Sequence, residues 1–331
     1  MAPQATNDRP FCILNDLSNV PESLRGGVVA IGNFDGVHRG HRAVLELAIK
    51  DAREAGVPVL AMTFEPHPRT FFCPDKPVFR LTPAHAKAEI MEAIGIDGLV
   101  EVAFAADFAG MSAEDFVKDI LVDQLGISQS ITGYDFHFGK ARQGTPEFLQ
   151  DAGKRHGFNV EIVGAQRDEG DNVVSSSRIR AALAEGDMPL ANGLLGYRYF
   201  VEATVQHGDK RGRLLGYPTA NLRLADNCTL KQGIYAVRVV VDGVVYDGVA
   251  SFGRRPTFDD GATLFEVHLF DFEGDLYDKT LRVGVIGYIR EEMKFDGPEA
   301  LIKQMDQDSM EARAMIASMR PLSDLDTALY P

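Results

Sequence analysis

Cysteine is scarce in this sequence. Cys12, Cys73 and Cys228 are scattered over 331 residues, and none of them belongs to a C-x-x-C pair. This spacing argues against a zinc site and against a disulfide framework. It is typical of a chain that works in a reducing compartment such as the cytoplasm.

Long apolar runs and basic residues are scarce as well. No apolar run is long enough to span a bilayer, and the opening MAPQATNDRP lacks the charged head and apolar core of a signal peptide. The chain has 48 Asp and Glu against 34 Lys and Arg, which gives a formal net charge of −14 at pH 7. We therefore expect a cytoplasmic protein with neither a membrane nor a nucleic acid as its partner. A site for an anion has to be built locally from basic side chains and helix ends.

Two common nucleotide fingerprints are absent from the most distinctive stretch, which reads VVAIGNFDGVHRGHRAVLEL from Val28 to Leu47. Its glycines precede no Lys-Ser or Lys-Thr pair and do not form G-x-G-x-x-G, which excludes the phosphate loop of the common ATPases and the dinucleotide fingerprint. The stretch contains an apolar run from Val28 to Ile31, a tight turn from Gly32 to Gly36, and the start of an amphipathic helix. This order points free backbone N–H groups and the positive end of the helix dipole at one place, which predicts a phosphate site.

Two histidines stand where that helix begins. His38 and His41 are three residues apart, so they share a helix face and can reach the oxygens of one phosphoryl group. Gly40 between them lets a ligand approach the backbone closely. The alternative is that both are surface histidines on an ordinary helix. The strand and the turn favour the phosphate site, whose predicted nucleotide contacts are Gly32, Asn33, Phe34, Asp35 and Gly40.

From Leu45 to about Val163 the pattern alternates between helix and strand, which predicts an α/β domain with a Rossmann-like parallel sheet and helices on its faces. Strands are expected at Val57–Phe64, Leu99–Phe104, Gln129–Gly133 and Asn159–Val163. Helices are expected from Thr82-Pro83 to Ile94, from Ser112 to Leu125, and from Thr145-Pro146 to His156. In such sheets, ligands bind beyond the carboxyl ends of the strands.

Aromatic side chains gather in two loops that follow these strands. Phe64 and Phe136 could stack on a planar ring, and Asp135 could fix the orientation of that ring, so we predict that all three contact a planar ligand. The alternative is that the phenylalanines only pack under their loops, and the sequence favours neither.

A second phosphate signal is the run from Ser175 to Arg180, SSSRIR. Ser176 and Ser177 at a helix start can hold a phosphate, and Arg180 is a candidate for the charge that gathers on a leaving pyrophosphate. The alternative is an ordinary serine cap with solvated arginines.

The pattern changes after Gly186. Residues 187–198 lack a regular period, and the short strands that follow, separated by turn signals, predict a small antiparallel β-barrel. The expected strands are Tyr199–Val205, Ile234–Val241 with a hairpin partner from Val244, Thr263–Phe270 and Leu281–Tyr288. Two helices, Pro298–Gln307 and Met310–Met319, are expected to close the chain, with a frayed terminus after them. We therefore expect two domains, residues 1–186 and residues 187–331.

The predicted barrel has its own phosphate signal, HGDKRGRLLGYPTAN, from His207 to Asn221. Thr219 and Asn221 project to one side of an extended segment and offer a hydroxyl and an amide oxygen for Mg²⁺ bound to a nucleotide. The alternative is a surface turn with solvated charges. The predicted nucleotide contacts in this loop are Gly208, Lys210, Gly212 and Gly216.

These motifs resemble those of known families. A strand followed by G-x-F-D-G-x-H-x-G-H is similar to the HxGH nucleotidyltransferase superfamily, and the serine run resembles its S-S-T-x-I-R motif, with Ser177 in place of the usual threonine. The sequence G-x-x-x-G-x-x-x-G-Y-P-T-A-N resembles the phosphate and metal motif of the riboflavin kinase family. Together they resemble the bifunctional bacterial riboflavin kinase and FAD synthetase family, roughly from Phe11 to Asp308.

The resemblance implies two reactions that use ATP and magnesium. The barrel would phosphorylate riboflavin to FMN, with Glu266 as the base and Arg290 near the flavin. The α/β domain would transfer AMP from ATP to FMN, with His38, His41 and Arg180 as catalytic residues, giving FAD and pyrophosphate. The planar ligand expected at Phe64, Asp135 and Phe136 would then be the flavin. Two alternatives remain: a related adenylyl- or cytidylyltransferase with another phosphate-bearing acceptor, fused to a flavin kinase, and a flavin-binding module that is not an enzyme.

Overall fold

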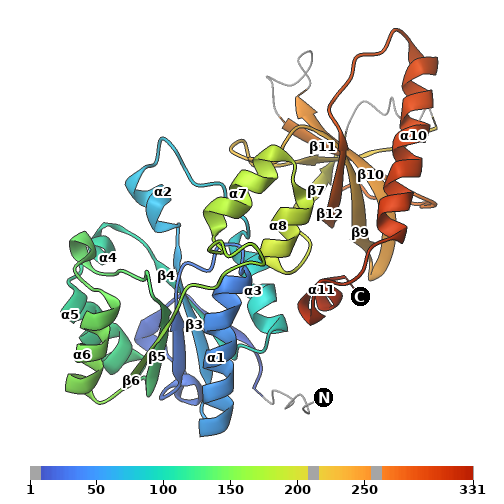
Figure 1. Cartoon of the computed structure of the whole chain (residues 1–331). Coiled ribbons are helices and arrows are strands. Elements are labelled where there is room, and N and C mark those ends of the chain that lie inside the picture. The colour runs from blue at the N-terminus through green and yellow to red at the C-terminus, as the bar shows by residue number, and fades with distance from the viewer. Residues whose placement is uncertain (1–8, 208–215, 255–262, 331) are drawn as a thin grey trace. The chain divides into compact units, whose positions relative to one another are not determined.

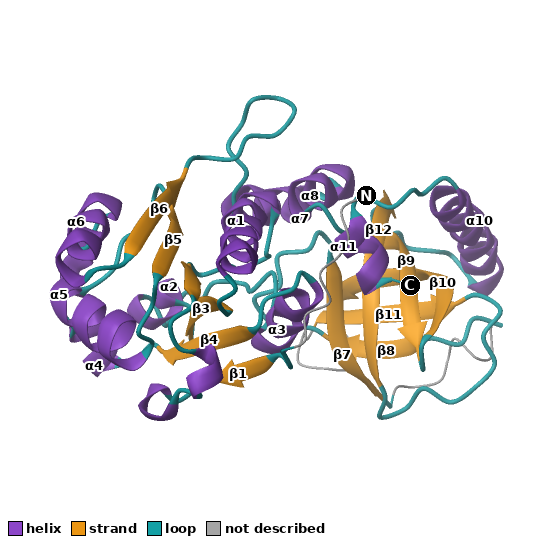
Figure 2. Ribbon diagram, turned by 90° about the horizontal axis from the view of Figure 1, so that it is seen from below, coloured by secondary structure: helices purple, strands orange, loops and turns teal. Residues whose placement is uncertain are grey.

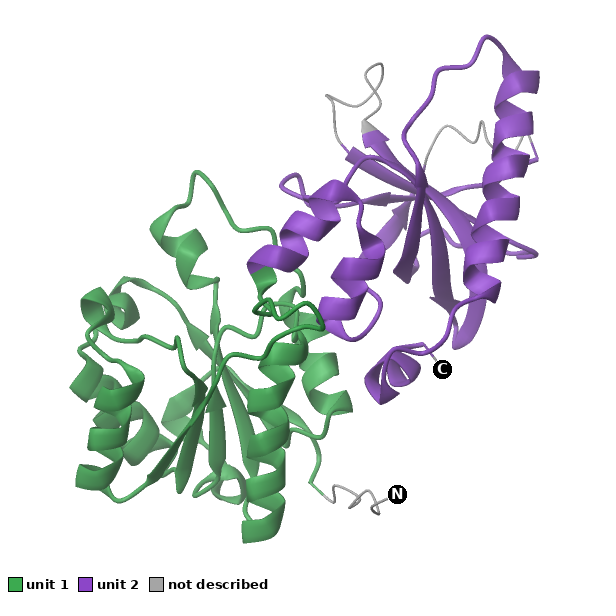
Figure 3. Ribbon diagram, viewed as in Figure 1, with its two compact units in different colours: residues 1–176 green, residues 177–331 purple. Residues whose placement is uncertain are grey.

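The chain folds into two compact units. The computed structural model describes residues 9–207, 216–254 and 263–330. Unit 1 comprises residues 1–176 and unit 2 comprises residues 177–331 (Figure 3). Within the described residues, no helix combines the length and the apolar character that a membrane crossing needs.

Unit 1 is built on a six-stranded parallel sheet with the strand order β1-β4-β3-β2-β5-β6 (Figure 1). Its strands are β1 (Cys12–Leu14), β2 (Val28–Ile31), β3 (Val59–Glu65), β4 (Gly98–Ala103), β5 (Gln129–Gly133) and β6 (Asn159–Val163). All four residues of β2 are buried, since this strand pairs with β3 on one side and β5 on the other. The predicted parallel sheet is therefore confirmed. The short strand β1, which pairs with β4, was not predicted.

The helices of unit 1 cover both faces of the sheet. Its α-helices are α1 (Arg39–Ala55), α2 (Pro68–Phe72), α3 (Ala84–Ala93), α4 (Ala106–Gly110), α5 (Ala113–Asp115) and α6 (Pro146–His156). The 3₁₀-helices are η1 (Leu17–Asn19), η2 (Glu22–Leu24) and η4 (Lys140–Arg142). The element η3 (Phe116–Gln124) is a π-helix. Helices α1 and α3 lie on one face, and α5 and α6 lie on the other (Figure 2).

The predicted start of α3 needs a correction. Thr82 was expected to cap this helix, but Pro83 occupies the N-cap position and no side chain caps the helix. The Thr82 hydroxyl instead accepts a hydrogen bond of 2.8 Å from the backbone N–H of Gly36. The Thr82 hydroxyl therefore binds the backbone N–H of Gly36 instead of a backbone N–H in the first turn of α3.

The strand order locates the ligand crevice of unit 1. From β2 the chain moves to β3 and β4 on one side, and later to β5 and β6 on the other side. The order reverses between β2 and β5, and ligands of open α/β sheets bind at the carboxyl ends of the strands that flank such a reversal. The turn after β2 and the loop after β5 therefore border the crevice.

Unit 2 contains a closed antiparallel barrel with the strand order β10-β11-β8-β7-β12-β9. Its strands are β7 (Phe200–Gln206), β8 (Ala220–Arg223), β9 (Gly233–Val241), β10 (Val244–Arg254), β11 (Thr263–Leu269) and β12 (Thr280–Arg290). The predicted hairpin between β9 and β10 is confirmed, with positive φ angles of 51° at Asp242 and 81° at Gly243. Strand β8 was not predicted.

The helices of unit 2 differ from the predicted ones. They are α7 (Ser176–Glu185), which begins at the last residue of unit 1, α8 (Met188–Leu195), α10 (Pro298–Ala317) and α11 (Asp324–Leu329). The stretch predicted to be irregular thus forms α8, whose first turn is capped by the side chain of Asp187. The two predicted closing helices are one continuous helix, because neither glycine nor proline interrupts residues 299–317.

The chain end is anchored rather than frayed as far as Leu329. Asp326 of α11 is 4% exposed, accepts a hydrogen bond of 2.9 Å from the backbone N–H of Arg198, and forms an ion pair with the guanidinium of the same residue. Tyr330 packs its ring against Gly284 of β12, where an added Cβ would collide with the hydroxyl. The expectation of a frayed terminus is therefore wrong for α11.

Candidate active sites

The turn after β2 is packed from inside by its own phenylalanine. Phe34 has a positive φ of 47° and is 1% exposed. A Cβ on Gly32 would lie 3.0 Å from the Phe34 ring, so glycine makes room for this ring. The ring meets His41 edge-on with 5.4 Å between centroids. Phe34 therefore supports the histidine from within, and its predicted contact with a nucleotide stays a prediction.

The two predicted histidines lie together at the start of α1. Their rings stack, with 3.6 Å between centroids and 14° between planes. His38 is the N-cap residue, and its Nδ1 accepts a 3.2 Å hydrogen bond from the backbone N–H of His41. A Cβ on Gly40 would lie 3.2 Å from the His38 ring, so this glycine also makes room for the stacked pair. The sequence suggested only that Gly40 gives access to a ligand.

His41 is held in its neutral form. Burial lowers its pKa well below the usual range, and the neighbouring His38 and Lys87 lower it further. Its Nδ1 is buried and has no hydrogen-bond partner in the described part of the chain. A buried polar atom without a partner points to a group that this structure does not contain, and a phosphate oxygen beside a helix N-terminus suits such a place.

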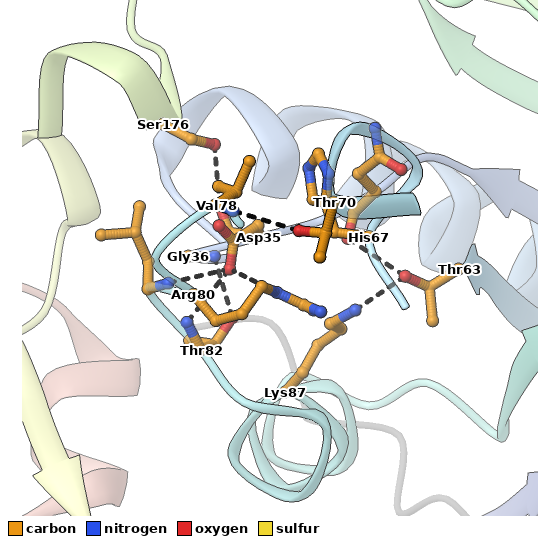
Figure 4. Close-up of polar contacts among 12 residues, drawn as sticks. Asp35, Gly36, Thr63, His67, Thr70, Val78, Arg80, Thr82, Lys87 and Ser176 are labelled. Atoms are coloured by element: carbon orange, nitrogen blue, oxygen red, sulfur yellow. Dashed lines mark hydrogen bonds and ion pairs between the residues drawn. The ribbon is translucent and has the colours of Figure 1, made fainter. Parts of the chain in front are cut away.

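Asp35 holds the turn against the segment that leads into α3 (Figure 4). Its carboxylate is buried, and Oδ1 accepts hydrogen bonds from the backbone N–H groups of Leu81 at 3.0 Å and Thr82 at 3.2 Å. The side chain of Arg80 lies 3.4 Å from the same oxygen. The predicted position of Asp35 beside a nucleotide is untested, and these contacts assign it a role in fixing the turn.

A partly buried ion cluster lies next to Asp35. The two terminal nitrogens of Arg80 each lie 2.6 Å from an oxygen of Glu65, at the end of β3. The Lys87 ammonium lies 2.9 Å from Glu65 Oε1 and 2.8 Å from the hydroxyl of Thr63. Burial by itself raises the pKa of Glu65, but Arg80 and Lys87 outweigh it and lower the pKa to about 2.

Sequence reasoning missed this cluster. The available signal was a lysine on an apolar helix face: Lys87 precedes Ile90 and Met91 by three and four residues, and all three are buried. A single lysine within an apolar stripe indicates a buried partner of opposite charge.

The carboxylate of Glu65 should make stability depend on acid pH. Its pKa in the folded protein, about 2, lies below its ordinary value of 4.5, so its contribution is fully present above pH 4.5 and is lost as the pH falls towards 2. We expect the free energy of unfolding to fall by about 2 kcal/mol more in the wild type than in Glu65→Gln between pH 7 and pH 3. Denaturant unfolding at several pH values measures the difference, and parallel pH curves for the two proteins would refute it.

The predicted flavin-binding aromatics have different surroundings. Phe64 is buried and packs against Phe104 and Phe108 with 6.2 and 5.7 Å between ring centroids, which favours a core role. Phe136 is partly buried and stacks on Phe138 at 5.5 Å, and Asp135 beside it is exposed. The loop after β5 therefore offers the more accessible of the predicted flavin contacts.

The serine run meets the histidine turn through one hydrogen bond. Ser176, the first residue of α7, donates through its hydroxyl to the backbone carbonyl of Asp35 at 2.8 Å. Ser177 is exposed, Arg180 is partly buried, and both belong to unit 2. Their predicted contacts with a nucleotide are untested.

In the barrel, Glu266 of β11 faces the predicted metal ligand. It lies directly opposite Asn221 of β8 and Ser251 of β10 in the strand register, so the three side chains share one face. The ring of His268 lies 2.9 Å from the carbonyl of Pro218, which fixes the chain just before Thr219. The structure thus brings the predicted base and a predicted metal ligand together.

The amide of Asn221 fits a hard cation. Its Oδ1 is buried and lacks a hydrogen-bond partner among the described residues. Within the same residues, no group of three or more His, Cys, Asp or Glu side chains is placed to hold a metal.

Of the other predicted site residues in unit 2, the structure describes Gly216 and Arg290. Gly216 has a φ of 84°, which favours glycine, while Gly208, Lys210 and Gly212 lie outside the described residues. Arg290 donates to both oxygens of buried Asp308 in α10, at 2.7 and 2.6 Å. Its predicted contact with a flavin is untested.

Comparison with known proteins decides the family. A model of FAD synthetase matches residues 20–178, and a model of riboflavin kinase matches residues 195–316. A bifunctional riboflavin kinase/FMN adenylyltransferase of Pseudomonas fluorescens is 44% identical over 307 residues, which cover 92% of this chain and 98% of that protein. The chain belongs to the bifunctional riboflavin kinase/FMN adenylyltransferase family. The predicted family resemblance is confirmed.

Other similar proteins also match nearly the full length of this family member. The bifunctional riboflavin kinase/FMN adenylyltransferase of Escherichia coli K12 is 38% identical, over 93% of this chain and 98% of that protein. A crystal structure of a macrolide-efflux protein from Streptococcus pneumoniae superposes with a TM-score of 0.81 and 30% identity, over 92% of this chain and 98% of that one. Within this bifunctional family member, the FAD synthetase match contains the histidine turn, and the riboflavin kinase match contains the face that carries Glu266.

Proposed function

We propose that this protein uses ATP to phosphorylate riboflavin to FMN and then transfers AMP from a second ATP to FMN, giving FAD and pyrophosphate. The observation that carries the proposal is the presence of both family matches in one chain, at residues 20–178 and 195–316. We assign adenylyl transfer to residues 1–186 and phosphorylation to residues 187–331. The cysteine pattern supports a cytoplasmic location.

In the phosphorylation step, Glu266 takes the proton of the terminal ribityl hydroxyl, and the oxygen attacks the γ-phosphorus of ATP while ADP leaves. Thr219 and Asn221 would hold the Mg²⁺ that accompanies the nucleotide, and the buried amide oxygen of Asn221, which has no hydrogen-bond partner among the described residues, supports this role. When bound, the cation supplies charge neutralisation at the phosphate oxygens. Arg290, which is fixed by Asp308, is proposed to border the flavin.

In the adenylyl-transfer step, the phosphate of FMN is already anionic and needs no strong base. One of its oxygens attacks the α-phosphorus of ATP, and the bond to the bridging oxygen of pyrophosphate breaks. His38 and His41 are proposed to donate hydrogen bonds to the α-phosphate oxygens beside the N-terminus of α1. Arg180 is proposed to balance the charge of the pyrophosphate beside the N-terminus of α7, where Ser176 and Ser177 stand. Phe136 and Asp135, with Phe64 in β3, are the proposed flavin contacts.

A single chromatographic assay tests the proposal. Purified protein with riboflavin, ATP and Mg²⁺ should form FMN first and FAD later, and supplied FMN with ATP should give FAD and pyrophosphate. FMN formation without FAD, together with turnover of another phosphate-bearing acceptor such as pantetheine phosphate, would indicate a different transferase. A protein that purifies yellow and consumes no ATP on addition of riboflavin would be a flavin-binding module.

A further inference from the structure

The lysine within the ion cluster of unit 1 is fully buried. The side chain of Lys87 is 0% exposed and lies on the face of α3 that packs towards the sheet. A buried ion pair can often be replaced as a whole by apolar residues of similar volume with little loss of stability, whereas removal of one partner alone is destabilising. Packing alone therefore does not account for an ammonium group at this position.

The first contact of this ammonium leads to the phosphate-site turn (Figure 4). Lys87 Nζ donates to the hydroxyl of Thr63 at 2.8 Å, and this hydroxyl donates to the backbone carbonyl of Asn33 at 3.0 Å. Because an ammonium group can only donate, it forces the single hydrogen of the hydroxyl towards Asn33.

The second contact leads to the same turn by another route. Lys87 Nζ donates to Glu65 Oε1 at 2.9 Å, and both oxygens of Glu65 hold Arg80. Arg80 in turn lies against the carboxylate of Asp35. One buried charge is thus connected to the turn at two points, Asn33 and Asp35, on either side of Phe34.

We propose that Lys87 is a positioning residue for adenylyl transfer, which holds the turn after β2 in place through Thr63 and through the Glu65–Arg80 pair. The inference rests on the proposed function of unit 1. Lys87 takes no part in the chemistry, and its positioning effect reaches the stacked histidines through the turn that precedes them. A displacement of about 1 Å in such a turn is enough to slow a reaction about 100-fold.

The test is Lys87→Met, which keeps the length of the side chain and removes its donors. The variant should form FAD from supplied FMN and ATP with a kcat lowered about 100-fold and with KM values for FMN and ATP changed less than about threefold. FMN formation from riboflavin, measured in the same sample, should stay at the wild-type rate. A wild-type protein that makes no FAD would refute the proposed function, whereas a Lys87→Met protein that matches an active wild type refutes only the positioning role.

A matched variant separates positioning from stability. Arg53 donates to both oxygens of fully buried Asp97 at 2.9 and 2.8 Å. Asp97 directly precedes β4 and so lies at the amino ends of the strands, whereas the turn follows the carboxyl end of β2. Arg53→Met should lower the thermal midpoint as Lys87→Met does, yet keep the wild-type kcat for FAD below that midpoint. Equal loss of kcat in both variants would show that Lys87 acts only through stability.

The two routes can be separated by single replacements. Thr63→Val and Glu65→Gln should each lower the kcat of FAD formation by less than Lys87→Met. Combining Glu65→Gln with Lys87→Met should add little to the effect of Lys87→Met alone, because both changes break the same route. Fully additive effects would contradict action through Glu65.

Discussion

Replacement of Glu266 by glutamine is expected to abolish FMN formation while FAD formation from supplied FMN continues. Glutamine keeps the shape of the side chain and its place opposite Asn221, but it cannot take the proton of the ribityl hydroxyl. Loss of a general base lowers the rate about 100- to 10,000-fold. Chromatographic rates of FMN from riboflavin, and of FAD from supplied FMN, measure the two reactions separately.

An exposed acid of the same unit serves as the control for this variant. Glu273 lies in the turn after β11, and Glu273→Gln removes the same charge without touching the face that Glu266 shares with Asn221. Both rates should equal those of the wild type. If Glu266→Gln kept FMN formation within about twofold, Glu266 would not be the base. If both rates fell in Glu266→Gln, misfolding would explain the loss.

Elements whose signals are local were predictable from the sequence. The β-branched run Val28–Ile31 forms β2 over the same residues, and β5 and β6 also have their predicted bounds. Thr145 caps α6 through its hydroxyl, as the Thr-Pro pair indicated. In these places, propensity, capping and burial favour the same structure, so the chain needs no distant partner to decide it.

The sequence-based predictions fail where the structure of a residue depends on a contact with a residue far away in the sequence. The hydroxyl of Thr82 binds Gly36, 46 residues away, and so leaves α3 without the expected cap. Lys87 and Glu65 meet across 22 residues, which no local pattern shows. At the candidate site, the sequence predicted that His38 and His41 share a face. It did not predict that they stack, or that Phe34 fills the turn beside them.

Replacement of His38 or His41 by alanine is expected to leave a protein that makes FMN and accumulates it. The two stacked rings stand at the N-terminus of α1, where the lowered pKa of His41 favours a neutral ring that can donate a hydrogen bond without carrying a charge. Loss of one preorganised donor to a phosphoryl oxygen lowers the rate about 100- to 1,000-fold. With riboflavin and ATP as substrates, the ratio of FMN to FAD should rise by a similar factor, while total flavin phosphorylation stays unchanged.

The control is a histidine of unit 1 that lies away from the turn. His156, at the end of α6, forms an ion pair with Glu114, and His156→Ala should keep the wild-type ratio because such surface pairs contribute little to stability. The two rings also differ in their contacts: His38 caps α1 through Nδ1, whereas Nδ1 of His41 has no partner in the described part of the chain. His38→Ala should therefore lower the thermal midpoint of unit 1 as well as its rate, while His41→Ala should lower mainly the rate. Unchanged FAD output in both variants would remove the histidines from the mechanism.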